Sequence, residues 1–340
     1  MELSPLCETK MATHASGLGR SLTRLCEKFP GRVGVGYKSL ENEDSVFLNP
    51  DKPFPTASVF KVFVLVDLFR RVAEGKLDLD STLALKDTDR SPGSGVLQYV
   101  GEGATMKLRQ YARLMMIISD NTAADVLFDF LGPESLADTI GWLGLKNTSI
   151  RSNCKDILTY GQPPKELRRN LELLGLSSRG LRPQDAMMLL RRNAHRLSGI
   201  HTLTELRRFL SSQAEEERQT QKKRIPNDDV TSPRDLVTTF ERVYCERVLG
   251  KYTDEFLEIM ASCETGQNRI RRGLPRDAIL VHKTGTVRGV VNDAGIVLGD
   301  SKPYALVVLV SDVPTNVRGG YVAKGEKIIS EISGLVWKSH

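Results

Sequence analysis

The order of the expected elements constrains the fold of this chain more than any other feature. Strand-like runs lie near both ends of the sequence, at 32–37, 45–48, 278–281, 295–298 and 304–310. Helical patterns fill the middle, at 57–75, 106–118, 122–131, 134–143, 232–249 and 253–263. Two further helical patterns lie outside the strands, at 17–29 and about 322–337. This order predicts an α+β layer that both ends of the chain build together, with a mostly helical domain inserted between them.

The same patterns predict where the domains begin and end. Residues 1–16 are an N-terminal extension, 17–56 and 265–340 form the sheet domain, and 57–264 form the helical domain. Within the helical domain, the segment 154–228 has a Gln-Pro-Pro break and a highly charged tail. We expect this segment to be a lid-like insertion with a solvated or mobile tail, and a binding surface is the alternative.

Composition and charge exclude several classes of protein. The hydrophobic fraction of 40% and the charged fraction of 26% are typical of a soluble globular chain. The net charge of +6 is spread along the sequence, so we expect no nucleic-acid partner. The longest apolar runs, at 62–66 and 304–310, are far shorter than a membrane span, so we expect no membrane partner.

The N-terminus and the cysteines both indicate a cytoplasmic chain. The first residues contain no apolar core of the kind that a secretory signal carries, which predicts a cytoplasmic chain, or a secreted one whose signal was removed. The five cysteines are an odd number and form no C-x-x-C pair, so neither a disulfide framework nor a zinc site is indicated. We expect reduced thiols, no metal and no cofactor.

One candidate nucleophile stands at the start of the apolar helical pattern at 57–75. Ser58 and Lys61 form an S-x-x-K motif, and residues three apart share one face of a helix. A desolvated lysine has a lowered pKa, so its neutral amine can accept the serine proton. The motif occurs again at 152–155, but no strong helical pattern follows it there. The sequence therefore favours Ser58 over Ser152.

Two further motifs supply polar groups that such a serine could use. Ser119-Asp120-Asn121 lies between two helical patterns, where Ser119 could relay a proton and the Asn121 amide could hold a peptide-like group. Lys283-Thr284-Gly285-Thr286 follows a β-branched run. Its lysine and hydroxyls could bind a carboxylate, and its glycine would let a substrate approach the backbone closely.

Together, and in this order, the three motifs resemble the S-x-x-K, S-D-N and K-T-G set of class A β-lactamases and penicillin-binding proteins. Further sequence segments are similar to class A chains, at 119–124, 232–235, 272–275 and 292–296. The resemblance covers about 17–150 and 229–338, and the enlarged segment 154–228 lengthens the interval between the second and third motifs. It implies a β-lactamase/transpeptidase-like fold, in which N- and C-terminal helices flank an antiparallel sheet.

The resemblance also implies a role for each motif residue. Ser58 is expected to be the acylated nucleophile, Lys61 its proton partner and Ser119 the relay to the leaving nitrogen. Asn121 is expected to hold the substrate amide. The substrate carboxylate is expected to lie on the strand that carries Lys283, Thr284, Gly285 and Thr286. The backbone N–H groups of Ser58 and Thr286 would form the oxyanion hole. Arg288 is a possible further carboxylate ligand, although a surface arginine is the simpler reading.

The deacylating glutamate of the family falls in the divergent segment. Glu166 has the family spacing, because an asparagine follows four residues later, but the residues between differ from the usual pattern. Glu172 and Asp156 are rival bases. The acylation residues are thus complete in the sequence, whereas the deacylation residues are not.

Two functions remain open at this point. The first is a serine hydrolase of the class A β-lactamase type, which opens a β-lactam or related amide or ester through an acyl-enzyme on Ser58. The alternative is a penicillin-binding DD-peptidase or acyltransferase, or a β-lactam-binding protein that deacylates slowly. In each case the expected partner is a small molecule that carries a carboxylate, and the oligomeric state stays open.

Overall fold

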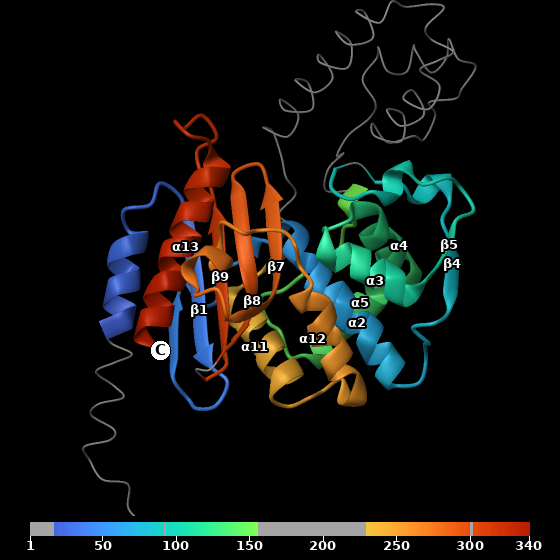
Figure 1. Ribbon diagram of the computed structural model, residues 1–340, viewed down its shortest axis with the longest axis horizontal. Helices are drawn as coiled ribbons and strands as arrows, with labels where there is room; N and C mark the ends of the chain where they lie inside the picture. The colour runs from blue at the N-terminus through green and yellow to red at the C-terminus, as the bar shows by residue number, and fades with distance from the viewer. Residues whose placement is uncertain (1–16, 92, 156–228, 300–301) are drawn as a thin grey trace, which may run out of the picture.

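A computed structural model describes residues 17–91, 93–155, 229–299 and 302–340. Its centre is a five-stranded sheet, which both ends of the chain build (Figure 1). The strands are β1 (Arg32–Ser39), β2 (Ser45–Leu48), β7 (Ile279–Val287), β8 (Val290–Leu298) and β9 (Tyr304–Ser311), in the order β2-β1-β9-β8-β7. Every neighbouring pair is antiparallel. The predicted α+β fold with an antiparallel sheet is confirmed.

Helices cover both faces of this sheet. On one face the helix at 17–26 and α13 (Tyr321–Ser339) contribute to one hydrophobic core with β1 and β9. On the other face α11 (Pro233–Tyr244) packs against β1 and β9. All eight residues of β9 are buried. A strand that is covered on both faces needs apolar residues at every position, which accounts for the unbroken apolar run at 304–310.

The second body of the molecule is helical and lies beside β7 (Figure 1). Its helices are α2 (Lys61–Ala73), α3 (Leu108–Ile117), α4 (Asn121–Leu131), α5 (Pro133–Trp142) and α12 (Thr253–Ala261). Ten of the thirteen residues of α2 are buried, so α2 is the central helix of this body. The short helices η1 (Ala57–Phe60), η2 (Asp87–Asp89), η3 (Leu97–Tyr99), η4 (Gly250–Tyr252) and η5 (Ile270–Gly273) connect the longer elements.

Two short ribbons were not expected from the sequence. β4 (Thr82–Ala84) pairs with β5 (Thr105–Lys107), and β3 (Phe54–Pro55) pairs with β6 (Val230–Thr231). The second ribbon ties the chain just before Ser58 to the start of α11. The expected helix start at Ser232-Pro233 is present, because the Ser232 side chain accepts a hydrogen bond from Asp235 N and Pro233 is the first helical residue.

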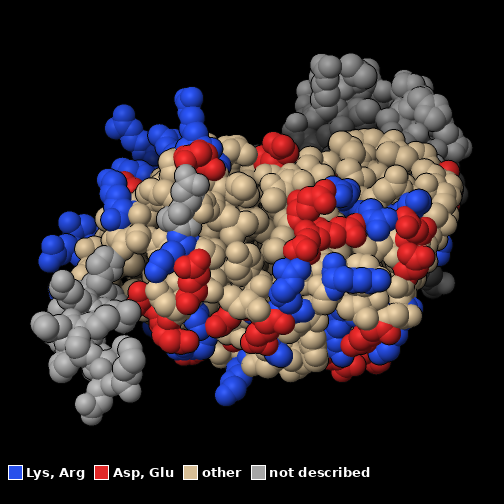
Figure 2. Space-filling model, turned by 60° about the horizontal axis from the view of Figure 1, so that its bottom comes forward, with Lys and Arg blue, Asp and Glu red and all other residues tan. Residues whose placement is uncertain are grey.

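The surface carries both signs of charge. On the face that Figure 2 presents, Lys and Arg side chains are interspersed with Asp and Glu. Several of them form ion pairs, such as Arg109 with Asp80 and Glu255. No helix in the described part of the chain is long and apolar enough to cross a membrane. The predicted domain boundaries stay predictions, since the segment 156–228 lies outside the described residues.

Candidate active site

A pocket of about 320 Å³ lies between the edge strand β7 and the helical body. Residues from all three predicted motifs line it, namely Ser58, Ser119, Asn121, Thr284 and Thr286. The two motif lysines are fully buried and hydrogen-bond to Ser119. The candidate bases Glu166, Glu172 and Asp156 lie outside the described residues. The structure thus gathers the predicted acylation residues at one place.

Ser58 lies in η1, directly before α2. The chain enters η1 in a strained conformation, because Ala57 has a φ of 45°. The Asn292 side chain on β8 holds this entry in place, since its Nδ2 donates to the carbonyls of Pro55 at 2.8 Å and Thr56 at 3.0 Å. The side chain of Ser58 is half-buried and faces the pocket. Within the described residues, no hydrogen bond occupies its hydroxyl.

Gly285 allows β7 to approach Ser58 closely. A Cβ at this position would lie 2.7 Å from the carbonyl oxygen of Thr56 and 3.1 Å from the backbone nitrogen of Ser58. The first distance is shorter than real Cβ contacts, and the second is tight, so a side chain here would push the strand away. The glycine therefore brings the backbone of β7 next to the N–H of Ser58, where the resemblance places the oxyanion hole.

Lys61 makes its contacts with the S-D-N turn. Its Nζ donates to the carbonyl of Ser119 at 2.7 Å, to Oδ1 of Asn121 at 2.8 Å and to Oγ of Ser119 at 3.2 Å. Burial lowers the pKa of the Lys61 ammonium below its ordinary value, although nearby acidic groups oppose this. The sequence led us to expect Lys61 beside the Ser58 hydroxyl. The described contacts instead join Lys61 to Ser119 and Asn121.

Ser119 lies between the two buried lysines. Its backbone has a φ of 57°, and its Oγ accepts from Lys61 Nζ at 3.2 Å and from Lys283 Nζ at 3.0 Å. A hydroxyl that accepts two hydrogen bonds keeps its own proton free to donate. Since Ser119 lines the pocket, this proton can be directed at a bound substrate.

Asp120 fixes the turn that presents Ser119. Its Oδ1 accepts from Ala123 N at 2.9 Å and so caps α4, and its Oδ2 accepts from Val96 N at 2.6 Å and Leu97 N at 2.9 Å. The Ser94 hydroxyl also donates to the carbonyl of Ser119 at 2.7 Å. The turn therefore derives its rigidity from a loop some twenty-five residues earlier in the chain.

A sequence model of the Beta-lactamase enzyme family matches residues 17–340 of the chain. The chain belongs to this family. The extended-spectrum beta-lactamase PER-1 of Pseudomonas aeruginosa is 30% identical over 125 residues, but the match spans only 36% of this chain and 41% of PER-1. Beta-lactamase VEB-1 of the same organism is 20% identical over 90% of this chain and 84% of its own length.

Solved structures share the fold over nearly the whole chain. A beta-lactamase from Chitinophaga pinensis superposes with a TM-score of 0.67 and 27% identity, over 95% of this chain and 98% of its own. PBP-A has a TM-score of 0.69 and 24% identity, with 95% of both chains covered. The fold of this family member is therefore that of both a beta-lactamase and PBP-A.

Arg269 is a pocket residue of this family member that the sequence analysis missed. It is only 5% exposed, and its Nη2 donates to Oγ1 of Thr286 at 2.6 Å. Its Nη1 donates to the backbone carbonyls of Gly285 and Asn292. By contrast, Arg288, the arginine that the sequence singled out, donates to Thr315 in an exposed region and does not line the pocket. No motif marks Arg269, so only its three-dimensional contacts could have identified it.

Cys154, within the second S-x-x-K motif, is a further pocket residue that the sequence analysis did not single out. Cys154 is buried and lines the pocket, although Ser152 does not. Lys155 is buried too, and its Nζ donates to the carbonyl of Thr88. No Asp or Glu is among the described residues that line the pocket. Likewise, no group of three or more His, Cys, Asp or Glu side chains in the described part of the chain is arranged to hold a metal ion.

Proposed function

We propose that this chain is a serine hydrolase that opens a β-lactam, or a related amide or ester, through an acyl-enzyme on Ser58. The observation that carries the proposal is the position of Ser119. Its hydroxyl is held by Lys61 and Lys283 in the same pocket that Ser58 lines. Acyl transfer from an amide requires a nucleophile and a proton relay, and here both line one pocket, with two buried lysines bonded to the relay.

The proposed acylation moves one proton in two steps. Burial favours the neutral amine of Lys61. This amine takes the proton of the Ser58 hydroxyl while the Ser58 oxygen attacks the carbonyl carbon of the substrate. Lys61 already donates to Ser119, so the proton can pass through the Ser119 hydroxyl to the leaving nitrogen. The backbone N–H groups of Ser58 and Thr286 would stabilise the oxyanion.

The same pocket favours a substrate that carries a carboxylate. Arg269 lines the pocket and pairs with Glu326 at 3.5 Å, and the buried Lys283 donates to Ser119, which also lines the pocket. Thr286 Oγ1 accepts from Arg269, so the Thr286 hydroxyl keeps a proton that it can donate to a carboxylate oxygen. Several relatives are named beta-lactamases, and the PBP-A neighbour has been solved as an acyl-enzyme with penicillin G in an L158E mutant. These names support a β-lactam as the substrate class.

Slow deacylation is the second candidate, because the deacylating base is not assigned. No Asp or Glu is among the described residues that line the pocket, and the candidate bases Glu166, Glu172 and Asp156 lie outside the described residues. A protein without a base to activate water would act as a penicillin-binding protein. The predicted cytoplasmic location and the absence of a nucleic-acid partner stay predictions from the sequence.

Intact mass spectrometry after mixing with a penicillin tests the proposal. The wild-type chain should gain the mass of one penicillin, and Ser58→Ala should abolish this adduct. Ser152→Ala is the matched control and should be labelled like wild type. An adduct that decays indicates a hydrolase, and one that persists indicates the second candidate. Full labelling of Ser58→Ala would reject the assignment of the nucleophile.

A further inference from the structure

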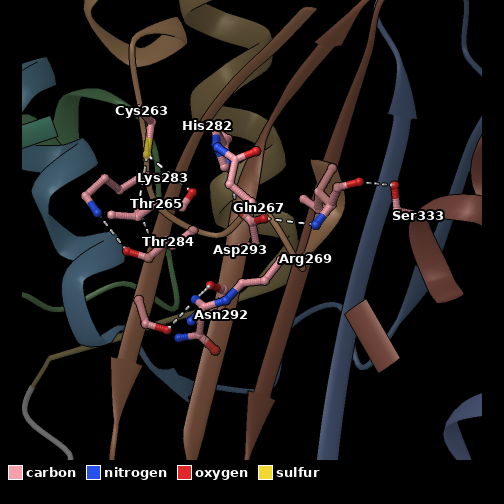
Figure 3. Close-up of polar contacts among 12 residues, drawn as sticks. Cys263, Thr265, Gln267, Arg269, His282, Lys283, Thr284, Asn292, Asp293 and Ser333 are labelled. Carbon is pink, nitrogen blue, oxygen red and sulfur yellow. Dashed lines mark hydrogen bonds and ion pairs between the residues drawn. The ribbon is translucent and has the colours of Figure 1, made fainter. Parts of the chain in front are cut away.

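A cluster of ionisable side chains that the proposed mechanism does not use lies next to Thr265 and Thr284, which line the pocket (Figure 3). Its members are Cys263, His282 and Asp293, which are 7%, 3% and 0% exposed. Nδ1 of His282 lies 2.7 Å from Oδ1 of Asp293, and the imidazole also hydrogen-bonds to the sulfur of Cys263. Three such groups buried in one line need an explanation, because each charged form is costly to bury.

The sheet register builds this line. His282 and Thr284 lie on the same face of β7, since side chains alternate along a strand. Asp293 of β8 is opposite Thr284, so its side chain lies diagonally across from His282. Gly295, opposite His282, leaves the room that the imidazole needs, because a Cβ there would lie 2.6 Å from the Cβ of His282.

Hydrogen bonds determine where the protons lie at the Asp293 end. Oδ2 of Asp293 accepts from the backbone N–H of Ile270 at 3.1 Å. Its Oδ1 faces Nδ1 of His282, so this nitrogen is the donor. This leaves the other ring nitrogen as the group that can hydrogen-bond to the sulfur of Cys263, as in the proton relays of nucleophilic catalysis.

Two positively charged groups act on the sulfur of Cys263. The charged groups that act on it are His282 and Lys283, both on β7. Burial alone would raise the pKa of Cys263, but His282 and Lys283 outweigh it and lower the pKa to about 6. Burial would likewise lower the pKa of His282, but Asp293 and the sulfur outweigh it and raise the pKa to about 10. Both shifts favour the thiolate form of Cys263 and the imidazolium form of His282.

The line continues from the sulfur into the pocket. Sγ of Cys263 lies 3.2 Å from Oγ1 of Thr265, which lies 2.5 Å from Oγ1 of Thr284. A thiolate only accepts hydrogen bonds, so the Thr265 hydroxyl donates to it and the Thr284 hydroxyl donates to Thr265. Both threonines line the pocket. Thr284 then offers a substrate only lone pairs, which leaves the Thr286 hydroxyl as the donor.

The sulfur also acts on Lys283. Burial lowers the pKa of Lys283 to about 7, and the negative charge of Cys263 is the largest effect that opposes this. Asp293 also opposes it, whereas the positive charges of Lys61 and Arg269 lower the pKa further. The ammonium of Lys283 donates to Ser119 Oγ and to the carbonyl of Thr284. A lysine at this position thus needs a nearby negative charge to stay protonated.

We propose that Cys263 is a buried thiolate, held by His282 and Asp293, and that this relay positions the carboxylate-binding groups of the pocket. Its negative charge favours the ammonium form of Lys283, and its acceptor turns the hydroxyls of Thr265 and Thr284 away from the substrate. Cys263, His282 and Asp293 are positioning residues, because they act through Lys283 and the threonines. The effect on substrate rests on the proposed function, whereas the thiolate itself does not.

The first experiment measures the thiolate without any substrate. The ultraviolet absorbance of thiolates is recorded for wild type and for Cys263→Ser from about pH 4 to about pH 11, and the difference isolates one sulfur. We expect a transition near pH 6. Cys245→Ser, which removes an exposed thiol whose pKa is raised, is the matched control and should keep this transition. A transition near the ordinary thiol value of 9.0 would overturn the proposal.

His282→Asn provides an independent measurement if Cys263→Ser does not fold. Without the imidazolium, the transition of Cys263 should move to higher pH by at least one unit, which is a tenfold change in the ionisation constant. An unchanged transition in a folded His282→Asn protein would also overturn the proposal.

The second experiment follows KM for a penicillin against pH. Binding of the carboxylate requires the Lys283 ammonium, so KM should rise as the pH passes above about 7. Without the sulfur charge the pKa of Lys283 falls, so in Cys263→Ser the rise should begin at lower pH. We expect KM to increase about tenfold near neutral pH, the effect of a shift of one unit, and kcat to change less.

An uncharged substrate separates this role from a merely structural one. The methyl ester of the same penicillin lacks the carboxylate, so its KM should be alike in wild type and Cys263→Ser. Equal losses for the acid and the ester would reject the positioning role. If Ser58 is never acylated, the proposed function fails, and the absorbance experiment still decides whether the thiolate exists. If the thiol titrates normally, the relay fails and the proposed function stands.

Discussion

At the scale of single residues, the two buried lysines differ in what they must do. Lys61 must accept a proton in the proposed acylation, whereas Lys283 must remain charged. Lys61→Arg keeps the positive charge but supplies no neutral amine near neutral pH, so acylation by a penicillin should slow about 10²-fold or more. Lys283→Arg keeps an anion partner and should lose less. Rates of adduct formation measured by mass spectrometry provide the comparison.

The control for this pair is Lys76→Arg. Lys76 is exposed and pairs with Glu74 on the surface, so the acylation rate of Lys76→Arg should equal that of wild type. A larger loss in Lys283→Arg than in Lys61→Arg would exchange the two roles. Because Lys61 contacts Ser119 and Asn121 rather than Ser58, the experiment also tests whether the proton passes through the S-D-N turn.

At the scale of elements, the approach of β7 to η1 sets the geometry of the site. Gly285→Ala would place a Cβ 2.7 Å from the Thr56 carbonyl and push the strand away from the N–H of Ser58. Loss of one oxyanion donor slows acyl transfer by about 10²-fold or more, and we expect acylation to fall by this amount. Stopped-flow measurement of acylation by a chromogenic cephalosporin gives the rate.

Gly141→Ala is the matched control for this change. Gly141 lies in α5 with nothing within 4 Å of the position of a Cβ, so acylation should be unchanged. Thermal unfolding of both variants shows whether a loss of rate is simply a loss of fold. Acylation of a folded Gly285→Ala protein at the wild-type rate would mean that the close approach has no part in catalysis.

The elements also show what the sequence could and could not predict. Long amphipathic helices and β-branched strands have clear periods, so the order of layers and the three motifs were predictable. The ribbons β3–β6 and β4–β5 have strands of two or three residues, which is too short for any period. Arg269 and the Cys263–His282–Asp293 line were missed for another reason. The pairing of β7 with β8 brings these residues together, and no local sequence motif encodes the register of that pairing.

At the scale of the whole molecule, acylation and deacylation depend on different parts of the chain. The groups proposed for acylation lie in the described residues, around one pocket between the sheet and the helical body. No described carboxylate lines that pocket, and Glu166, the glutamate with family-like spacing, lies in the segment 154–228. The rate of adduct formation and the lifetime of the adduct should therefore respond to different substitutions.

Glu166→Gln separates the two steps. It removes a general base but leaves Ser58, Lys61 and Ser119 intact, so the adduct should form at the wild-type rate and persist about 10²-fold longer. Glu172→Gln tests the rival base. The control is Glu27→Gln, because Glu27 is exposed and lies far from both glutamates in the sequence. A lengthened lifetime in Glu172→Gln alone would transfer the role to Glu172. If neither variant changes the lifetime, neither glutamate is the base, and Asp156 remains as the rival that the sequence offers.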